Sequence, residues 1–103
     1  MGKLERVVSG DVRTVQQRLE WQLAYEEWQQ GPLWREKRRL VFERCRGICE
    51  GCGVRRAVEV HHVRYPRGEL PGSEGWKRLE KLWDMVGICE RCHREIHEGK
   101  GAL

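Results

Sequence analysis

The chain has 103 residues, 35% of them charged, and a formal net charge of +4, which predicts one compact domain. Residues 1–31 carry four basic and five acidic side chains, whereas residues 32–103 carry sixteen and eleven. This uneven distribution favours a polyanionic partner such as nucleic acid, although a solvated surface explains it equally well. No apolar run has the length of a signal-peptide core or a membrane span, so we expect a cytoplasmic protein with reduced thiols.

The first third of the chain predicts two helices joined at Gly31 and Pro32. The first runs from Val12 to Gln30, behind Asp11, whose carboxylate can cap it. Its apolar residues fall on two neighbouring faces: Val12, Val15, Leu19 and Leu23, and then Trp21, Tyr25 and Trp28. The expected buried side of the second helix comprises Trp34, Val41, Cys45 and Ile48. We interpret the aromatic residues as core rather than as platforms for stacked bases.

The remaining predicted elements are short and are separated by glycine and proline. We expect strands at residues 57–61 and 86–88 and helices at residues 76–83 and 90–98. Residues 63–75 are predicted to form a loop, and Gly99 is a typical stop for the last helix. The predicted class is α+β, with two short strands among helices.

Four of the five cysteines form two Cys-x2-Cys pairs, Cys49 with Cys52 and Cys89 with Cys92. This spacing lets both thiolates of a pair reach one ion, so the four residues predict a structural zinc site. Residues 53–88 separate the pairs, which is longer than the roughly 15–20 residues of a simple zinc ribbon. The fifth cysteine, Cys45, is interpreted as a buried thiol.

All four histidines lie between or just after these cysteines. His93 and His97 are four residues apart, so on a helix they project from one face. His61 and His62 are adjacent, and on a strand they point to opposite faces. We expect His61 to join His93 and His97 around one divalent ion with open positions. His62 would then be a free imidazole suited to general base catalysis, whereas the alternative is four surface histidines.

Residues 32–99 resemble an HNH endonuclease of the ββα-metal class (His-Me finger), in its zinc-framed subgroup with four cysteine ligands. The matching segments are Trp34-Arg35 to Arg44, Cys49-Glu-Gly-Cys52-Gly53, Val60-His61-His62-Val63-Arg64-Tyr65, Leu82-Trp-Asp84 and Cys89-Glu-Arg-Cys92-His93-x3-His97. The resemblance implies a small ββα-metal domain (residues 32–99) with a structural zinc held by the four cysteines. Residues 1–31 would be an N-terminal helical extension and residues 100–103 a tail.

The resemblance also implies a reaction, the metal-dependent hydrolysis of DNA phosphodiester bonds to give 5′-phosphate and 3′-hydroxyl ends. His62 would be the general base, and His61, His93 and His97 would hold the catalytic ion. Asp84 stands where the family has its central Asn, and it would orient and support His62. Candidate contacts to DNA phosphates are Arg64, Arg67, Arg91 and Arg94.

The identity of the catalytic ion stays open among Mg²⁺, Mn²⁺, Ni²⁺ and Zn²⁺. Substrate chemistry favours the first two, and imidazole ligands favour the last two. DNA is the expected partner, together with a second copy of the chain or a phage or restriction protein, in a prokaryotic or phage setting. The main alternative function is a non-catalytic zinc module that binds DNA or protein; it needs the four cysteines but not three converging histidines.

Overall fold

The computed structural model describes residues 14–99. Helix α1 (Val15–Gln29) begins at Thr14, whose side chain accepts a hydrogen bond from the Gln17 backbone while the Gln17 side chain accepts from Thr14 N. This reciprocal capping box explains the start of the helix. The predicted cap Asp11, residue Val12 and the tail at residues 100–103 lie outside the described residues.

Helix α2 (Pro32–Cys45) follows after Gln30 and Gly31, with Pro32 in its first turn as predicted. It ends where Arg46 adopts a left-handed conformation with φ of 55° and Gly47 follows with φ of 77°. The Arg46 amide donates to the Glu43 carbonyl and the Gly47 amide to the Phe42 carbonyl. These bonds satisfy two carbonyls of the last helical turn. The chain then turns into the first cysteine pair.

Two short strands form an antiparallel hairpin, β1 (Glu59–His62) and β2 (Met85–Ile88), in which His61 pairs with Val86 and His62 with Met85. Between them the chain forms α3 (Glu74–Leu79) and the 3₁₀ turn η2 (Leu82–Asp84). The single helix predicted over residues 76–83 is therefore wrong. After β2 comes α4 (Glu90–His97), with Gly99 just beyond its end at φ of 78°.

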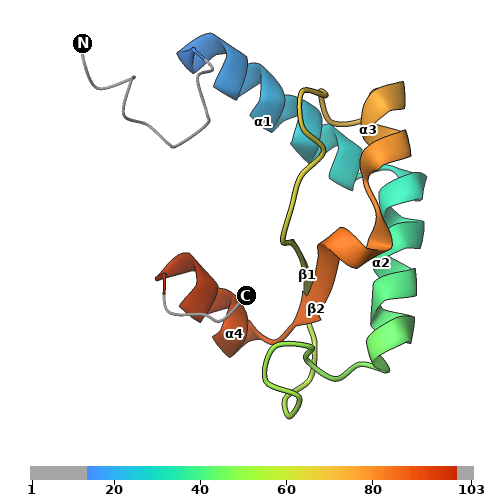
Figure 1. Cartoon of the computed structure of the whole chain (residues 1–103), viewed down its shortest axis with the longest axis vertical. Coiled ribbons are helices and arrows are strands. Elements are labelled where there is room, and N and C mark those ends of the chain that lie inside the picture. Colours follow the sequence, from blue (N-terminus) through green and yellow to red (C-terminus); the bar gives the residue numbers. More distant parts are fainter. Residues whose placement is uncertain (1–13, 100–103) are drawn as a thin grey trace.

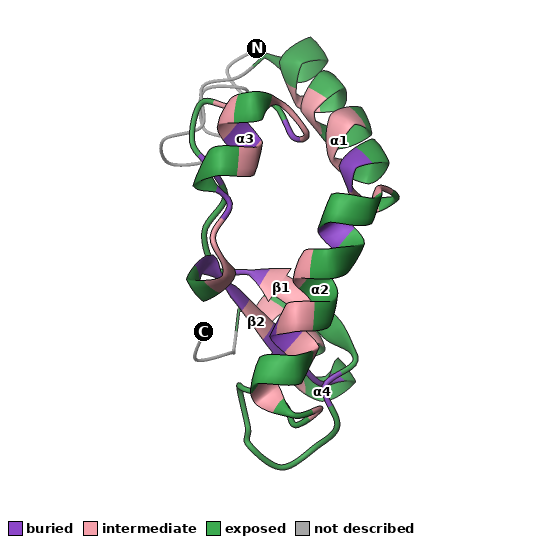
Figure 2. Ribbon diagram, turned by 90° about the vertical axis from the view of Figure 1, so that its right-hand side faces the viewer, coloured by how far each residue is buried: buried purple, intermediate pink, exposed green. Residues whose placement is uncertain are grey.

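The hairpin lies between α2 and α4, whereas α1 and α3 stand together at the other end of the molecule (Figure 1). One hydrophobic cluster occupies the α2 side of the hairpin and comprises Trp28, Trp34, Val41, Trp76 and Met85. A second, on the α4 side, comprises Cys49, Ile88 and Cys89, with Val86, Cys92 and Ile96 packed against it. Most residues of β2 are buried, whereas β1 is mostly intermediate or exposed (Figure 2). Because successive side chains of a strand point to opposite faces, the hairpin contributes residues to both clusters.

The apolar faces of the first two helices are covered unequally. The aromatic face of α1 packs into the first cluster through Trp21, Tyr25 and Trp28, as predicted. The aliphatic face is exposed instead, with Val15 50%, Leu19 60% and Leu23 66% accessible. Ile48, expected on the buried side of the second helix, lies beyond the helix end and is 44% exposed.

The α+β class is confirmed. No helix within residues 14–99 combines the length and the apolar character needed to cross a bilayer. The division into an extension (residues 1–31) and a nuclease domain (residues 32–99) stays a prediction. The structure adds that the aromatic side chains of α1 belong to the main core.

Candidate metal centre and nuclease site

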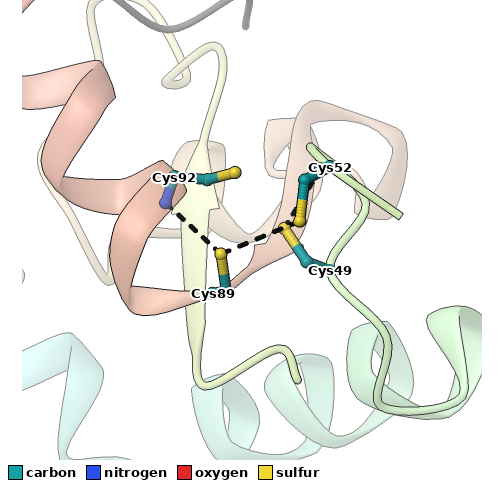
Figure 3. A group of neighbouring side chains, drawn as sticks. All are labelled: Cys49, Cys52, Cys89 and Cys92. Atoms are coloured by element: carbon teal, nitrogen blue, oxygen red, sulfur yellow. Dashed lines mark hydrogen bonds between the residues drawn. The ribbon is translucent and has the colours of Figure 1, made fainter. Parts of the chain in front are cut away.

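The sulfur atoms of Cys49, Cys52, Cys89 and Cys92 lie within 4.8 Å of one another (Figure 3). The first pair comes from the turn after α2, which we call the knuckle (residues 49–52), and the second from the start of α4. Cys49 and Cys89 are buried. Cys45 lies outside this cluster, and its thiol contacts the Phe42 carbonyl at 3.6 Å. The structure thus brings together the four predicted ligands and leaves out the fifth cysteine.

Backbone amides point at the sulfur atoms of this cluster. Cys49 Sγ accepts from Gly51 N at 3.2 Å and from Cys52 N at 3.4 Å, and Cys89 Sγ accepts from Cys92 N at 3.3 Å. The amides of Arg55 and Val54 lower the pKa of Cys52 to about 6. Burial, followed by hydrogen bonds with the neighbouring thiols, raises the pKa of Cys92 to about 12.

The backbone of the knuckle passes close to two sulfur atoms at Gly51. A Cβ on this residue would lie 3.2 Å from Cys92 Sγ and 3.5 Å from Cys49 Sγ. The donor set is four thiols with amide donors behind them, which fits Zn²⁺ in a closed tetrahedral site. Such an ion would be structural, since no coordination position is left for a substrate.

Three imidazoles converge on the opposite side of β1 from α2. His93 and His97 face each other on α4, with 3.0 Å between their Nε2 atoms. The ring of His61 lies 6.0 Å from that of His93 and 6.2 Å from that of His97. Burial, followed by the neighbouring imidazoles, lowers the pKa of His61, which favours the neutral form that binds metals. Unlike the four sulfur atoms, the ligand atoms of these three histidines do not all lie within 4.8 Å of one another.

His62 lies on the other face of the strand, inside the first core. Its ring is stacked between Trp34, at 5.3 Å, and Tyr65, at 4.6 Å. Its side chain is 0% exposed. Both ring nitrogens have partners: Nδ1 lies 3.2 Å from the Tyr25 hydroxyl, and Nε2 lies 2.7 Å from a Glu80 carboxylate oxygen. The free, substrate-facing imidazole expected at this position is instead enclosed.

The carboxylate that contacts His62 is that of Glu80 rather than that of Asp84. Asp84 accepts two hydrogen bonds from Arg64, at 3.1 and 3.2 Å, through the same oxygen. Its backbone carbonyl accepts from Val63 N at 2.8 Å, so it anchors the chain leaving β1. Sequence reasoning missed Glu80, because its partners stand 18 or more positions away and no local motif marks it.

The four arginines proposed for DNA contacts all lie at the surface. Arg64 is 69% exposed despite its pairing with Asp84. Arg91 pairs with Glu95 one turn along α4 at 3.3 Å. Arg94 lies on the same helix and Arg67 in the loop after β1. The Arg91–Glu95 pair is exposed on both sides, and ion pairs of this kind are weak.

The chain is similar in sequence to parts of two longer proteins. No protein-family model matches the sequence. The chain is 32% identical over 71 residues to the type IV methyl-directed restriction enzyme EcoKMcrA of Escherichia coli (strain K12), covering 60% of this chain and 23% of that protein. It is 34% identical over 58 residues to the COX1/OXI3 intron 2 protein of Saccharomyces cerevisiae, covering 52% of this chain and 7% of that protein. The chain thus spans less than a quarter of either relative.

A solved structure matches most of the chain. It is the HNH endonuclease of the deep-sea thermophilic bacteriophage GVE2 with a manganese ion, which superposes with a TM-score of 0.63 at 19% identity. The match covers 85% of this chain and 95% of the phage protein. The HNH fold predicted from the sequence is thereby confirmed.

Proposed function

We propose that this chain, which has the HNH endonuclease fold, is a metal-dependent nuclease that hydrolyses phosphodiester bonds in DNA. The observation that carries the proposal is the convergence of His61, His93 and His97 beside a four-cysteine cluster. A purely structural module needs the sulfur cluster but gains nothing from three histidines gathered at its side. The name of the restriction enzyme relative and the fold of the phage nuclease support DNA as the substrate.

His61, His93 and His97 are the residues that would hold the catalytic ion. Three imidazoles leave coordination positions open for water and a phosphate oxygen. When bound, a divalent ion there would supply Lewis-acid stabilisation of the phosphate in the transition state. Candidate metals are Mg²⁺, Mn²⁺, Ni²⁺ and Zn²⁺. The structure of the phage nuclease contains a manganese ion, whereas nitrogen ligands favour Ni²⁺ and Zn²⁺.

In this proposal His62 is the general base. Its Nε2 is held by Glu80, so Nδ1 is the atom that can take a proton from water. The Tyr25 hydroxyl occupies that position, and it must leave before a water can enter.

The surface arginines would hold the substrate. Arg64, Arg67, Arg91 and Arg94 are exposed, and their guanidinium groups can bind phosphate oxygens without reading bases. Asp84 would then position Arg64. Any partner protein or second copy of the chain would have to provide sequence specificity.

The burial of His62 favours the second candidate, a non-catalytic zinc module that binds DNA or protein. An imidazole whose two nitrogens are both satisfied inside a core can be purely structural. In that case the purified chain would hold one tightly bound zinc and no second divalent ion. Metal analysis together with a titration by Mn²⁺ or Ni²⁺ distinguishes the two functions.

The direct test is cleavage of supercoiled plasmid with each of the four metals. Substituting His93→Ala and His97→Ala together should abolish nicking while leaving the zinc content at one per chain. Glu90→Ala, an exposed change on the same helix, should cleave like the unaltered protein. Nicking that survives the loss of both histidines would refute the proposed ion site, and no nicking with any metal would refute the nuclease.

A further inference from the structure

Glu80 is a charged side chain placed inside the core. Its side chain is 0% exposed, and it receives hydrogen bonds from three different elements. His62 Nε2 lies at 2.7 Å, Lys37 Nζ at 3.1 Å and Trp28 Nε1 at 3.3 Å. Lys37 also donates to the Glu80 backbone carbonyl at 2.8 Å. Burying a carboxylate is costly unless it is paired and fully hydrogen-bonded, and here every partner is a donor.

These donors keep the carboxylate ionised. Burial alone would raise the pKa of Glu80, but the hydrogen bond from His62 and the charge of Lys37 outweigh it, and the pKa lies below its usual value. An ionised carboxylate is purely an acceptor. The Nε2 atom of His62 must therefore carry a hydrogen in order to make its 2.7 Å contact.

The other ring nitrogen, Nδ1, lies 3.2 Å from the Tyr25 hydroxyl. An imidazole that acts as a base with its hydrogen on Nε2 presents its lone pair at Nδ1. Burial raises the pKa of Tyr25 well above its usual value, so its hydroxyl stays protonated and can donate. The stacking of the His62 ring between Trp34 and Tyr65 prevents the ring from turning over.

We propose that Glu80 is the positioning residue of this site: it fixes the hydrogen of His62 on Nε2 and thereby makes Nδ1 the proton-accepting atom. The orienting role that the sequence predicted for Asp84 then belongs to a residue four positions earlier. The catalytic purpose of this arrangement rests on the proposed nuclease function. The placement of the hydrogen does not, and it can be measured without any cleavage.

The first experiment reads that hydrogen directly, by ¹⁵N NMR of histidine-labelled protein at mildly alkaline pH. Unaltered protein should show His62 with hydrogen on Nε2, and Glu80→Ala should lose this single state and give a mixture of tautomers. Glu80→Gln should retain it, because the amide oxygen still accepts a hydrogen bond. Hydrogen on Nδ1 in the unaltered protein, or no change in Glu80→Ala, would overturn the assignment.

The second experiment measures plasmid nicking by the same variants. Glu80→Ala should lower kcat by about 10- to 100-fold with little change in KM, and Glu80→Gln should recover part of the loss. Glu74→Gln is the matched control, since this carboxylate is exposed and pairs only with Lys77 on α3. Equal kcat values for Glu80→Ala and the control would overturn a role in the reaction.

Folding failure is separated from loss of positioning by a double variant. Lys37→Met with Glu80→Gln removes both buried charges together, so neither is left unpaired. It should keep the zinc content and helix signal of the unaltered protein, together with the Nε2 tautomer. If unaltered protein cuts no DNA with any metal but shows the expected tautomers, the proposed function fails while the assignment of Glu80 stands.

Discussion

Arg44 on α2 and Glu50 in the knuckle form a two-point contact, with guanidinium nitrogens 2.9 and 2.6 Å from the two carboxylate oxygens. The same guanidinium donates to the carbonyls of Leu82 and Met85 at 2.9 and 2.8 Å. Glu50 in turn accepts from Gly87 N at 2.9 Å. One arginine therefore links the second helix, the first half of the zinc site and the start of β2.

This contact gives the first prediction, that Arg44→Ala destabilises the protein by about 1 to 2 kcal/mol. The substitution removes the Arg44 hydrogen bonds to two backbone carbonyls and to Glu50, whose carboxylate keeps the bond from Gly87 N. Urea or thermal unfolding with zinc present measures the loss. Arg39→Ala is the control, because Arg39 pairs on the exposed side of the same helix with Glu36 and Glu43 and should matter little. Equal losses in the two variants would contradict the prediction.

The second prediction concerns Gly51 and the binding of zinc. A methyl group there would lie 3.2 Å from Cys92 Sγ, so in Gly51→Ala the Cys92 side chain must move by a few tenths of an ångström. We expect about a tenfold loss of zinc affinity, measured by competition with a chromophoric chelator. Gly68→Ala is the comparison, since its Cβ meets open space although its φ of 71° strains the backbone. It should lower stability without lowering zinc affinity.

Short-range spacing is what made the cysteine cluster and the proximity of His93 and His97 predictable. Two residues between cysteines and three between His93 and His97 fix which side chains can share an ion, whatever the rest of the fold does. The side chains of β1 alternate between its two faces, so His61 and His62 point to opposite faces, as expected. Which face would be buried does not follow from alternation. That depends on α2, whose Trp34 covers His62.

Two features of the core do not follow from local patterns. On α1 the aliphatic and aromatic residues form adjacent stripes of equal periodicity, and periodicity alone cannot decide which one meets the core. Three aromatic residues bury more area than three aliphatic ones, so Trp21, Tyr25 and Trp28 face inward. Glu80 was overlooked because its burial is set by Lys37 and Trp28, which lie 43 and 52 positions earlier.

The third prediction tests whether the Tyr25 hydroxyl competes with the attacking water. Tyr25→Phe keeps the ring in the core but removes the group that occupies His62 Nδ1. A net hydrogen bond of about 1 kcal/mol corresponds to roughly a fivefold higher nicking rate. Time courses on supercoiled plasmid measure it. A lower rate would mean that the hydroxyl takes part in the reaction rather than blocking it.

The fourth prediction follows from the charge of Glu80. Its pKa in the folded protein lies below the usual 4.5, since hydrogen bonding to His62 and the charge of Lys37 outweigh the effect of burial. The carboxylate therefore adds stability that is fully present above pH 4.5 and is lost as the pH falls through the folded-state pKa. Unfolding free energies of unaltered protein and Glu80→Gln should differ most near neutral pH and converge in acid. Release of zinc in acid affects both proteins, so the difference between them isolates Glu80. A difference that stays constant from about pH 7 to pH 3 would mean that this carboxylate carries no charge in the folded protein.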